Sequence, residues 1–181
     1  MLIQCAADFH GRKERYAKFL EGVKKEKPHL IILAGDFGYV EDSIFDGINV
    51  PIYGVVGNMD GELNHLKNIK FIDNRVVEFR GLLISGAIKA IEVDEVDIII
   101  SHIPPYKTKD RAFFGMHIGD KKLREIMNEK KPKYIICGHI HEDAGYGKFG
   151  GTIVVNCSIG KRGEYTLIDT EKEEVKMVGY L

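Results

Sequence analysis

Five short polar clusters interrupt the first 141 residues of this chain, and each follows an apolar run. The clusters are Asp8-Phe9-His10, Gly35-Asp36, Gly57-Asn58-Met59-Asp60, Ser101-His102 and Gly138-His139-Ile140-His141. Carboxylate, imidazole and amide donors together suit Mn, Fe or Zn, and no Cys-x-x-Cys pair offers a thiolate site. In an extended chain, residues i and i+2 point to the same side, so an Asp-x-His or His-x-His pair can bind one ion. The clusters therefore predict a metal centre.

The apolar runs before the clusters have the character of buried strands. They are Leu2 to Ala7, Leu30 to Ala34, Pro51 to Val56, Val96 to Ile100 and Tyr134 to Cys137. Helical spacing of apolar residues marks 12–25 and 120–130 as helices between them. Alternating strands and helices predict a largely parallel sheet, whose ligands bind at the carboxyl ends of the strands. All five clusters should meet at that edge.

The remaining segments indicate a second sheet. A hairpin is expected from Arg75–Phe79 and Leu82–Gly86, with its turn at Gly81. The last three apolar segments, 152–156, 163–169 and 175–178, predict a closing antiparallel run.

Composition limits the class of protein. The chain has 181 residues, 44% of them hydrophobic and 29% charged, so we expect one globular domain over residues 1–181. Lys and Arg (26) nearly balance Asp and Glu (27), and the net charge of -1 argues against a nucleic-acid partner. The apolar runs fall far short of the roughly 20 residues that a spanning helix needs, so no membrane association is expected.

The N-terminus and the cysteines predict a cytoplasmic protein. Residues 1–10 lack a basic leader and a small-residue cleavage site. The cysteines Cys5, Cys137 and Cys157 are odd in number and sit in or beside apolar runs, as expected for core thiols in a reducing compartment.

Taken together, the clusters resemble the five-part signature of the calcineurin-like metallophosphoesterases, which runs Asp-x-His, Gly-Asp, Gly-Asn-His-Asp/Glu, His, Gly-His-x-His. The resemblance covers residues 8–141 in the correct order. It implies an α/β fold, a four-layer αββα sandwich of two mixed β-sheets flanked by helices. It also implies two divalent metal ions at the strand ends, drawn from Mn, Fe, Zn or Ni, with Mn expected to support activity in vitro.

The resemblance assigns a role to each matching position. Asp8, His10 and His141 would bind one ion, and Asn58, His102 and His139 the other, with Asp36 bridging both. Two ions can clamp phosphoryl oxygens and activate a water as hydroxide, which gives Asp36, Asn58 and His102 catalytic roles and Asn58 a contact with substrate. The alternative is that these polar residues cap loops.

The third motif departs from the family at Met59, where many members carry a histidine that assists the leaving group. Methionine cannot donate a proton, so we expect a preference for phosphodiesters over monoesters. His117, in the loop after His102, is a candidate catalytic and phosphate-contacting substitute; a loop histidine held by backbone hydrogen bonds is the alternative. Asp110 recurs near it in a prokaryotic subgroup that the chain also resembles.

Other residues near the motifs have weaker assignments. Tyr39 and Phe37 are candidates to line the pocket and stack on a substrate ring, with packing against the adjoining loop as the alternative. Asp60 is expected to cap a segment starting at Gly61, and His65 to lie in a helical segment. The basic residues of the 107–111 loop are candidates to attract an anionic substrate.

The leading hypothesis is a phosphoesterase that hydrolyses small nucleotide-like phosphodiesters. The alternative is a catalytically weak, metal-binding interaction scaffold of the same fold, which the intact set of seven ligands disfavours. A DNA-repair nuclease would need a capping domain, for which 181 residues leave little room. The expected partner is a small phosphoester, and a homo-oligomer is left open.

Overall fold

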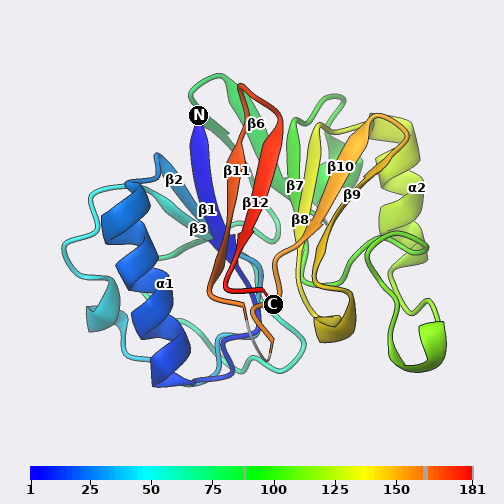
Figure 1. The fold of residues 1–181 in the computed structure, drawn as a ribbon. Coiled ribbons are helices and arrows are strands. Elements are labelled where there is room, and N and C mark those ends of the chain that lie inside the picture. The colour runs from blue at the N-terminus through cyan, green and yellow to red at the C-terminus, as the bar shows by residue number, and fades with distance from the viewer. Residues whose placement is uncertain (88, 161–162, 181) are drawn as a thin grey trace.

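The computed structural model describes residues 1–87, 89–160 and 163–180, and it contains two mixed β-sheets of six strands each (Figure 1). The first sheet comprises β1 (Leu2–Ala6), β2 (Leu30–Leu33), β3 (Ile52–Gly54), β4 (Lys70–Phe71), β11 (Tyr165–Asp169) and β12 (Glu174–Val178). The second comprises β5 (Val76–Phe79), β6 (Leu82–Gly86), β7 (Ile98–Ile100), β8 (Tyr134–Cys137), β9 (Gly145–Phe149) and β10 (Thr152–Asn156). The strand orders are β12-β11-β1-β2-β3-β4 and β5-β6-β7-β8-β10-β9.

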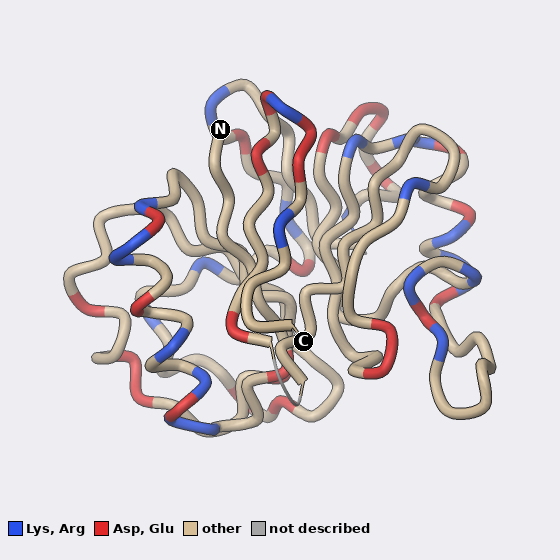
Figure 2. The backbone as a smooth tube through the Cα atoms, in the orientation of Figure 1, with Lys and Arg blue, Asp and Glu red and all other residues tan. Residues whose placement is uncertain are grey.

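Two α-helices cover the outer faces of the sheets, α1 (Lys13–Glu26) on the first and α2 (Lys121–Lys130) on the second (Figure 1). In the described part of the chain, four short 3-10 turns lie in the connections: η1 (Asp42–Phe45), η2 (Lys89–Glu92), η3 (Phe113–Gly115) and η4 (His141–Asp143). The expected four-layer αββα sandwich is confirmed. Charged residues concentrate on the helices and connections, whereas the central strands carry few (Figure 2).

The buried strands are apolar on both faces because each sheet is covered on both sides. In β2, Leu30 and Ile32 pack between the sheets, whereas Ile31 and Leu33 pack under α1. In the second sheet, Ile135 packs under α2. Alternate residues therefore serve two different cores, which is why the sequence shows no polar alternation there.

Parallel pairing sets the position of the polar clusters. In the first sheet β1, β2 and β3 run parallel, and in the second β6, β7, β8 and β10 do. Their carboxyl ends therefore lie at one edge, at the bottom of Figure 1, where the clusters follow them.

The predicted hairpin of β5 and β6 is confirmed, with Gly81 at a positive φ of 79°. The predicted closing antiparallel run is wrong as a single unit. β10 pairs parallel to β8 in the second sheet, while β11 and β12 form a hairpin beside β1 in the first. The glycine-rich β9 and the two-residue β4 were not predicted, because neither has an apolar run.

Within the described residues, no helix is long and apolar enough to cross a membrane.

Candidate metal centre

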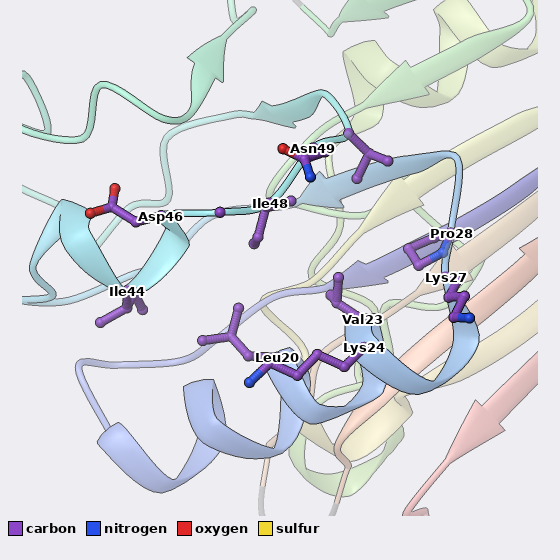
Figure 3. Close-up of a pocket in the computed structure, with 11 residues that line it drawn as sticks. Leu20, Val23, Lys24, Lys27, Pro28, Ile44, Asp46, Ile48 and Asn49 are labelled. Atoms are coloured by element: carbon purple, nitrogen blue, oxygen red, sulfur yellow. The ribbon is translucent and has the colours of Figure 1, made fainter.

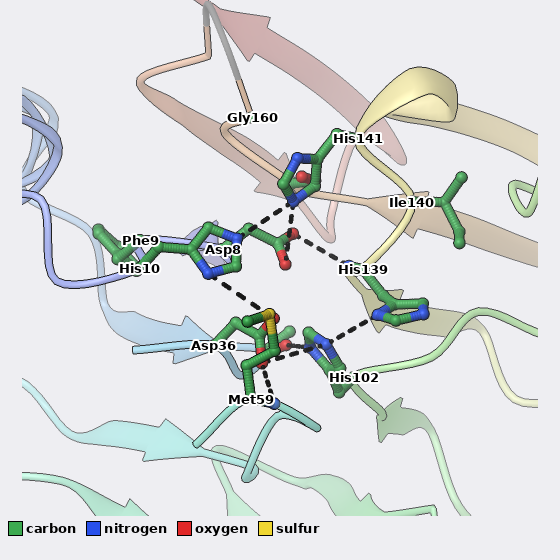
Figure 4. Close-up of polar contacts among 12 residues, drawn as sticks. Asp8, Phe9, His10, Asp36, Met59, His102, His139, Ile140, His141 and Gly160 are labelled. Atoms are coloured by element: carbon green, nitrogen blue, oxygen red, sulfur yellow. Dashed lines mark hydrogen bonds and ion pairs between the residues drawn. The ribbon is translucent and has the colours of Figure 1, made fainter. Parts of the chain in front are cut away.

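The seven predicted ligands lie together at the carboxyl edge of the two sheets, and short contacts join all of them. Figure 4 labels six of them, all except Asn58. They come from loops after five strands: β1, β2, β3, β7 and β8. The convergence of side chains separated by more than 100 residues follows from the parallel pairing described above.

One group combines Asp8, His10 and His141. The Nε2 atoms of His10 and His141 lie 3.3 Å apart, and His141 Nε2 lies 3.5 Å from Asp8 Oδ1. One ligand atom from each residue falls within 4.8 Å of the others. This group matches the set that the resemblance assigned to one ion.

A second group surrounds His102. Its Nε2 lies 2.8 Å from Asn58 Oδ1, 3.2 Å from His139 Nδ1 and 3.5 Å from Asp36 Oδ1. Asp8, Asp36 and His102 also offer ligand atoms within 4.8 Å of one another. Asp8 thus belongs geometrically to both groups, which the resemblance did not imply.

Asp36 lies between the two groups, as a bridging ligand must. Its Oδ1 faces His102, and its Oδ2 lies 3.8 Å from His10 Nδ1. The backbone N–H of Met59 also donates to Oδ1, at 2.9 Å.

The donor set fits divalent cations. Asp8 is fully buried, and its Oδ1 receives no hydrogen bond from any part of the chain that the structure describes. A buried carboxylate oxygen without a partner is costly, and a cation would satisfy it. His102 Nδ1 donates to the carbonyl of Ala34 at 2.8 Å, which fixes the tautomer that leaves Nε2 as the ligand atom.

The charges of the cluster favour ionised carboxylates. Burial raises the pKa of Asp8 and of Asp36, but the neighbouring imidazoles of His141 and His102 outweigh it and hold each pKa below its ordinary value. Burial also lowers the pKa of His10 and of His139, which favours the neutral imidazole that binds metal.

The backbone at the ligands is not extended, as the i and i+2 argument assumed. Asp8, His10, Asp36 and His139 have positive φ angles of 67°, 50°, 56° and 70°. Non-glycine residues adopt this left-handed region at a cost, and such strain concentrates at functional sites. The Asp-x-His and His-x-His residues therefore reach the centre through tight turns after their strands. Their i, i+2 spacing marked side chains that lie together, but the extended backbone that we expected for them is wrong.

The glycines before the ligands permit the close approach that the sequence suggested. A Cβ on Gly35 would lie 2.6 Å from His102 Nδ1, and one on Gly57 would lie 2.2 Å from the backbone nitrogen of Asp36. A Cβ on Gly138 would lie 2.9 Å from Asp8 Oδ2. No larger residue fits at these positions without moving the ligands.

The expected capping role of Asp60 is wrong, because residues 61–69 form no helix. Its Oδ2 accepts the backbone N–H groups of Asp36 (2.9 Å) and Gly57 (2.8 Å), and its Oδ1 accepts that of Gly38 (3.1 Å). Asp60 therefore ties the second motif to the third. His65 likewise lies outside any helix.

Arg15, which the sequence motifs do not include, ties the first motif to the segment after β10. Its guanidinium donates to the carbonyl of Asp8 at 2.5 Å and to that of Gly160. No spacing in the sequence singles out this arginine.

Met59 is exposed over the cluster, with 71% of its surface accessible (Figure 4). The side chain that replaces the family's histidine thus faces the space where a substrate would bind, and it carries no proton to donate.

His117 is held by a carboxylate rather than by backbone groups. Its Nδ1 lies 2.6 Å from Oδ1 of the buried Asp110, whose oxygens also accept the N–H groups of Lys107, Thr108 and Gly119. Burial raises the pKa of Asp110, but the hydrogen bonds from His117 and the backbone outweigh it, so the pKa lies below its ordinary value. None of the described contacts links His117 to the seven ligands.

The other candidate side chains also lie apart from the cluster contacts. Tyr39 is exposed, stacks on His65 with ring centroids 6.2 Å apart, and lines a pocket of about 350 Å³ beside α1. Phe37 is fully buried and packs edge-on against Phe71, so the packing alternative applies to it. Lys109 pairs with Asp143 at 2.6 Å, which ties its loop to η4.

A pocket of about 420 Å³ lies between α1 and the segment after η1 (Figure 3). Its walls include Leu20, Val23, Ile44 and Ile48. None of the seven ligands lines it, so volume alone does not mark the functional site.

Two mixed sheets with a cluster of candidate metal ligands at their shared carboxyl edge are the arrangement that the resemblance to the calcineurin-like metallophosphoesterases implied. Residues 1–173 match the calcineurin-like phosphoesterase superfamily domain, and the chain belongs to this family.

Two curated relatives match parts of the chain. The uncharacterized protein MJ1162 of Methanocaldococcus jannaschii is 37% identical over 82 residues, which are 42% of this chain and 36% of that protein. The UPF0046 protein T07D4.2 of Caenorhabditis elegans is 27% identical over 114 residues, 51% of this chain and 29% of that protein. The matches thus span about a third of the length of these relatives.

Solved structures share the fold over nearly the whole chain. The protein TT1561 of Thermus thermophilus has a TM-score of 0.75 at 16% identity, with 98% of both chains covered. A novel archaeal phosphodiesterase has a TM-score of 0.71 at 20% identity, covering 99% of this chain and 100% of that one. Vps29 of Entamoeba histolytica has a TM-score of 0.56 at 12% identity, with 100% of both covered. At these identities the likeness shows the fold alone.

Proposed function

We propose that this protein hydrolyses small, nucleotide-like phosphodiesters at a centre of two divalent metal ions. The observation that carries the proposal is a pair of ligand groups that meet at the buried carboxylates of Asp8 and Asp36. Asp8 Oδ1 lacks a hydrogen-bond donor among the described residues. Two sites joined by carboxylates suit two cations close together.

The proposed ligands divide between the two ions. Asp8, His10 and His141 would hold one ion, while Asn58, His102 and His139 would hold the other. Asp36, which contacts members of both groups, would bridge them. When bound, divalent ions supply Lewis acidity and lower the pKa of water at the centre. Manganese is the ion proposed for assays.

The protein's own groups then orient the substrate and the ligands. Asn58 has its amide at the edge of the cluster, where its nitrogen can donate to a phosphoryl oxygen while its Oδ1 faces His102. The carbonyl of Ala34 holds the ring of His102 in place. These contacts fix the ligands before substrate arrives, so little reorganisation is needed during the reaction.

The preference for diesters rests on Met59. A monoester with a poor leaving group depends on proton donation, which Met59 cannot supply. The phosphate-contacting role of His117 and the stacking role of Tyr39 remain predictions.

We also propose that residues 1–181 form one domain that works in the cytoplasm. Cys5, Cys137 and Cys157 are all buried and free. A reducing compartment keeps such cysteines as thiols.

The test is hydrolysis of bis-p-nitrophenyl phosphate and p-nitrophenyl phosphate with Mn²⁺, comparing wild type with Asp36→Asn and His102→Ala. Both variants should lose at least about 100-fold in kcat/KM, since metal ions stabilise the transition state by several kcal/mol. Asp97→Asn, at the opposite edge of the sheets, is the control and should keep full activity. Activity unchanged in both variants would overturn the assignment of the centre. A wild type that binds metal but hydrolyses neither ester would favour the scaffold that resembles Vps29 in fold.

A further inference from the structure

A pocket of about 280 Å³ opens beside the candidate metal centre, and Asn58 and His102 form part of its wall. The rest of the wall includes four aliphatic side chains and two carboxylates. These residues, which define the Asp73 pocket, are Val55, Val56, Ile100, Ile103, Asp73 and Asp120. Whatever is esterified to a phosphate at the centre can extend into this pocket.

Each carboxylate has one oxygen engaged by the backbone. Asp73 Oδ1 accepts the N–H of Val56 at 3.0 Å. Asp120 Oδ1 accepts the N–H groups of Lys122 and Leu123, at 2.7 and 3.0 Å, and so caps α2. Within residues 1–87, 89–160 and 163–180, no group donates to either Oδ2, and neither carboxylate forms an ion pair.

These carboxylates restrict the chemistry of a ligand. A second phosphate in the pocket would be repelled by two uncompensated negative charges. An ammonium group would lie next to the two divalent cations of the proposed centre, which would repel it. An uncharged group with hydroxyl donors meets neither penalty, and carboxylate oxygens are strong acceptors for such donors.

The size and the walls of the pocket also favour an uncharged group that carries hydroxyls. Its volume lies at the low end for small-molecule sites, which suits one small group rather than a whole cofactor. Aliphatic walls with a few placed acceptors suit a carbon skeleton that carries two hydroxyls on one edge. Partial burial of Asp73, which raises its pKa, also reduces competition from water.

We propose that the Asp73 pocket binds a vicinal diol on the alcohol portion of the phosphodiester, with Asp73 as the residue that determines this specificity. The diol belongs either to a ribose or to a glycerol. This inference rests on the proposed phosphodiesterase function and names its substrate class.

The test compares p-nitrophenyl diesters that differ only in the second alcohol. One pair is a ribonucleoside 5′-ester and its 2′,3′-dideoxy analogue; the other is a glyceryl ester and its propyl analogue. Wild type should prefer the diol member of at least one pair by about 10- to 100-fold in kcat/KM, the range for hydrogen bonds to a charged group. The pair that shows the preference identifies the source of the diol.

Asp73→Asn should abolish that preference while keeping the activity on the diol-free esters. The new amide can still accept the N–H of Val56, so the loop keeps its contact, and only the oxygen that accepts no hydrogen bond from the described residues is replaced by an NH2 group. Asp97→Asn is the matched control, because Asp97 likewise accepts a backbone N–H, that of Leu83 at 2.9 Å, but lies at the opposite edge of the sheets.

The outcomes separate the two proposals. Equal rates within both pairs in wild type, or a preference that survives Asp73→Asn, would overturn the diol pocket while leaving the phosphodiesterase intact. Failure to hydrolyse any diester with metal bound would instead overturn the proposed function. A preference lost equally in the Asp97 control would also overturn the specific role of Asp73.

Discussion

Removal of the Asp60 carboxylate should damage both the stability of the fold and the metal centre. Asp60 accepts three backbone N–H groups, from Asp36, Gly38 and Gly57, at 2.8 to 3.1 Å. In Asp60→Ala all three donors lose their acceptor at once, and the loops that carry Asp36 and Asn58 lose their common tie.

The expected loss follows from this count. Hydrogen bonds to a charged acceptor contribute about 1.5–3 kcal/mol each when buried. Asp60 is half-buried, so water replaces part of each bond and about 1 kcal/mol per bond is appropriate. Asp60→Ala should therefore lower the free energy of unfolding by about 3 kcal/mol, or the melting temperature by about 6–12 °C for a chain of this size. Asp60→Asn can keep the two bonds at Oδ2 and should lose only about 1 kcal/mol.

Urea denaturation of the metal-free protein measures the stability, and calorimetric titration with Mn²⁺ measures the affinity. Residues that support metal ligands typically contribute 10- to 100-fold to affinity, so Asp60→Ala should weaken metal binding by about that factor. Asp42→Ala is the control, because Asp42 binds Asn68 far from the ligands and its loss should cost stability but no metal affinity. A loss below about 1 kcal/mol in Asp60→Ala, or an unchanged affinity, would refute this role.

Three further substitutions test the close packing at Gly35, the buried carboxylate of Asp110 and the effect of Met59 on the reaction. Gly35→Ala should destabilise the protein by at least about 2 kcal/mol more than Gly47→Ala in urea denaturation, because both glycines have positive φ but only Gly35 lacks space for a Cβ; equal losses would contradict the packing argument. Asp110→Asn should cost about 2 kcal/mol at pH 7, because the folded protein holds the pKa of this carboxyl below its ordinary value. That stabilisation is complete above the unfolded pKa of about 4 and is lost as the pH falls through the lower folded pKa, so the two unfolding curves should converge in acid; a gap independent of pH would count against it. Met59→His should raise kcat for an alkyl phosphomonoester at least about tenfold, and an unchanged kcat would mean that proton donation does not limit the reaction.

Most of the fold could be predicted because short uninterrupted apolar runs mark the buried strands and helical spacing of apolar residues marks the two α-helices. Strands such as Tyr134–Cys137 and Thr152–Asn156 have the predicted bounds. The assignment of strands to sheets was not readable, since β10 and β11 look alike in sequence yet pair in different sheets. The choice of neighbouring strand depends on contacts between residues that are distant in the sequence, and the local pattern of apolar residues does not predict those contacts.

The positions of the site residues could be predicted, but not the backbone turns and hydrogen bonds that hold their side chains in place. Polar residues after buried strands located the cluster, because parallel strands share a carboxyl edge. The left-handed turns at Asp8 and Asp36 were not predicted, because non-glycine residues rarely adopt that conformation. The roles of Arg15 and Asp60 were also missed, because each acts through backbone groups distant in sequence.

The number of metal ions bound per chain tests the central claim most directly. Wild-type protein, equilibrated with Mn²⁺ and freed of excess ion, should hold two ions per chain by elemental analysis, and Asp36→Asn should hold fewer than one because it loses the shared ligand. A wild-type chain that binds one ion or none, or a variant that still binds two, would contradict the two-metal centre.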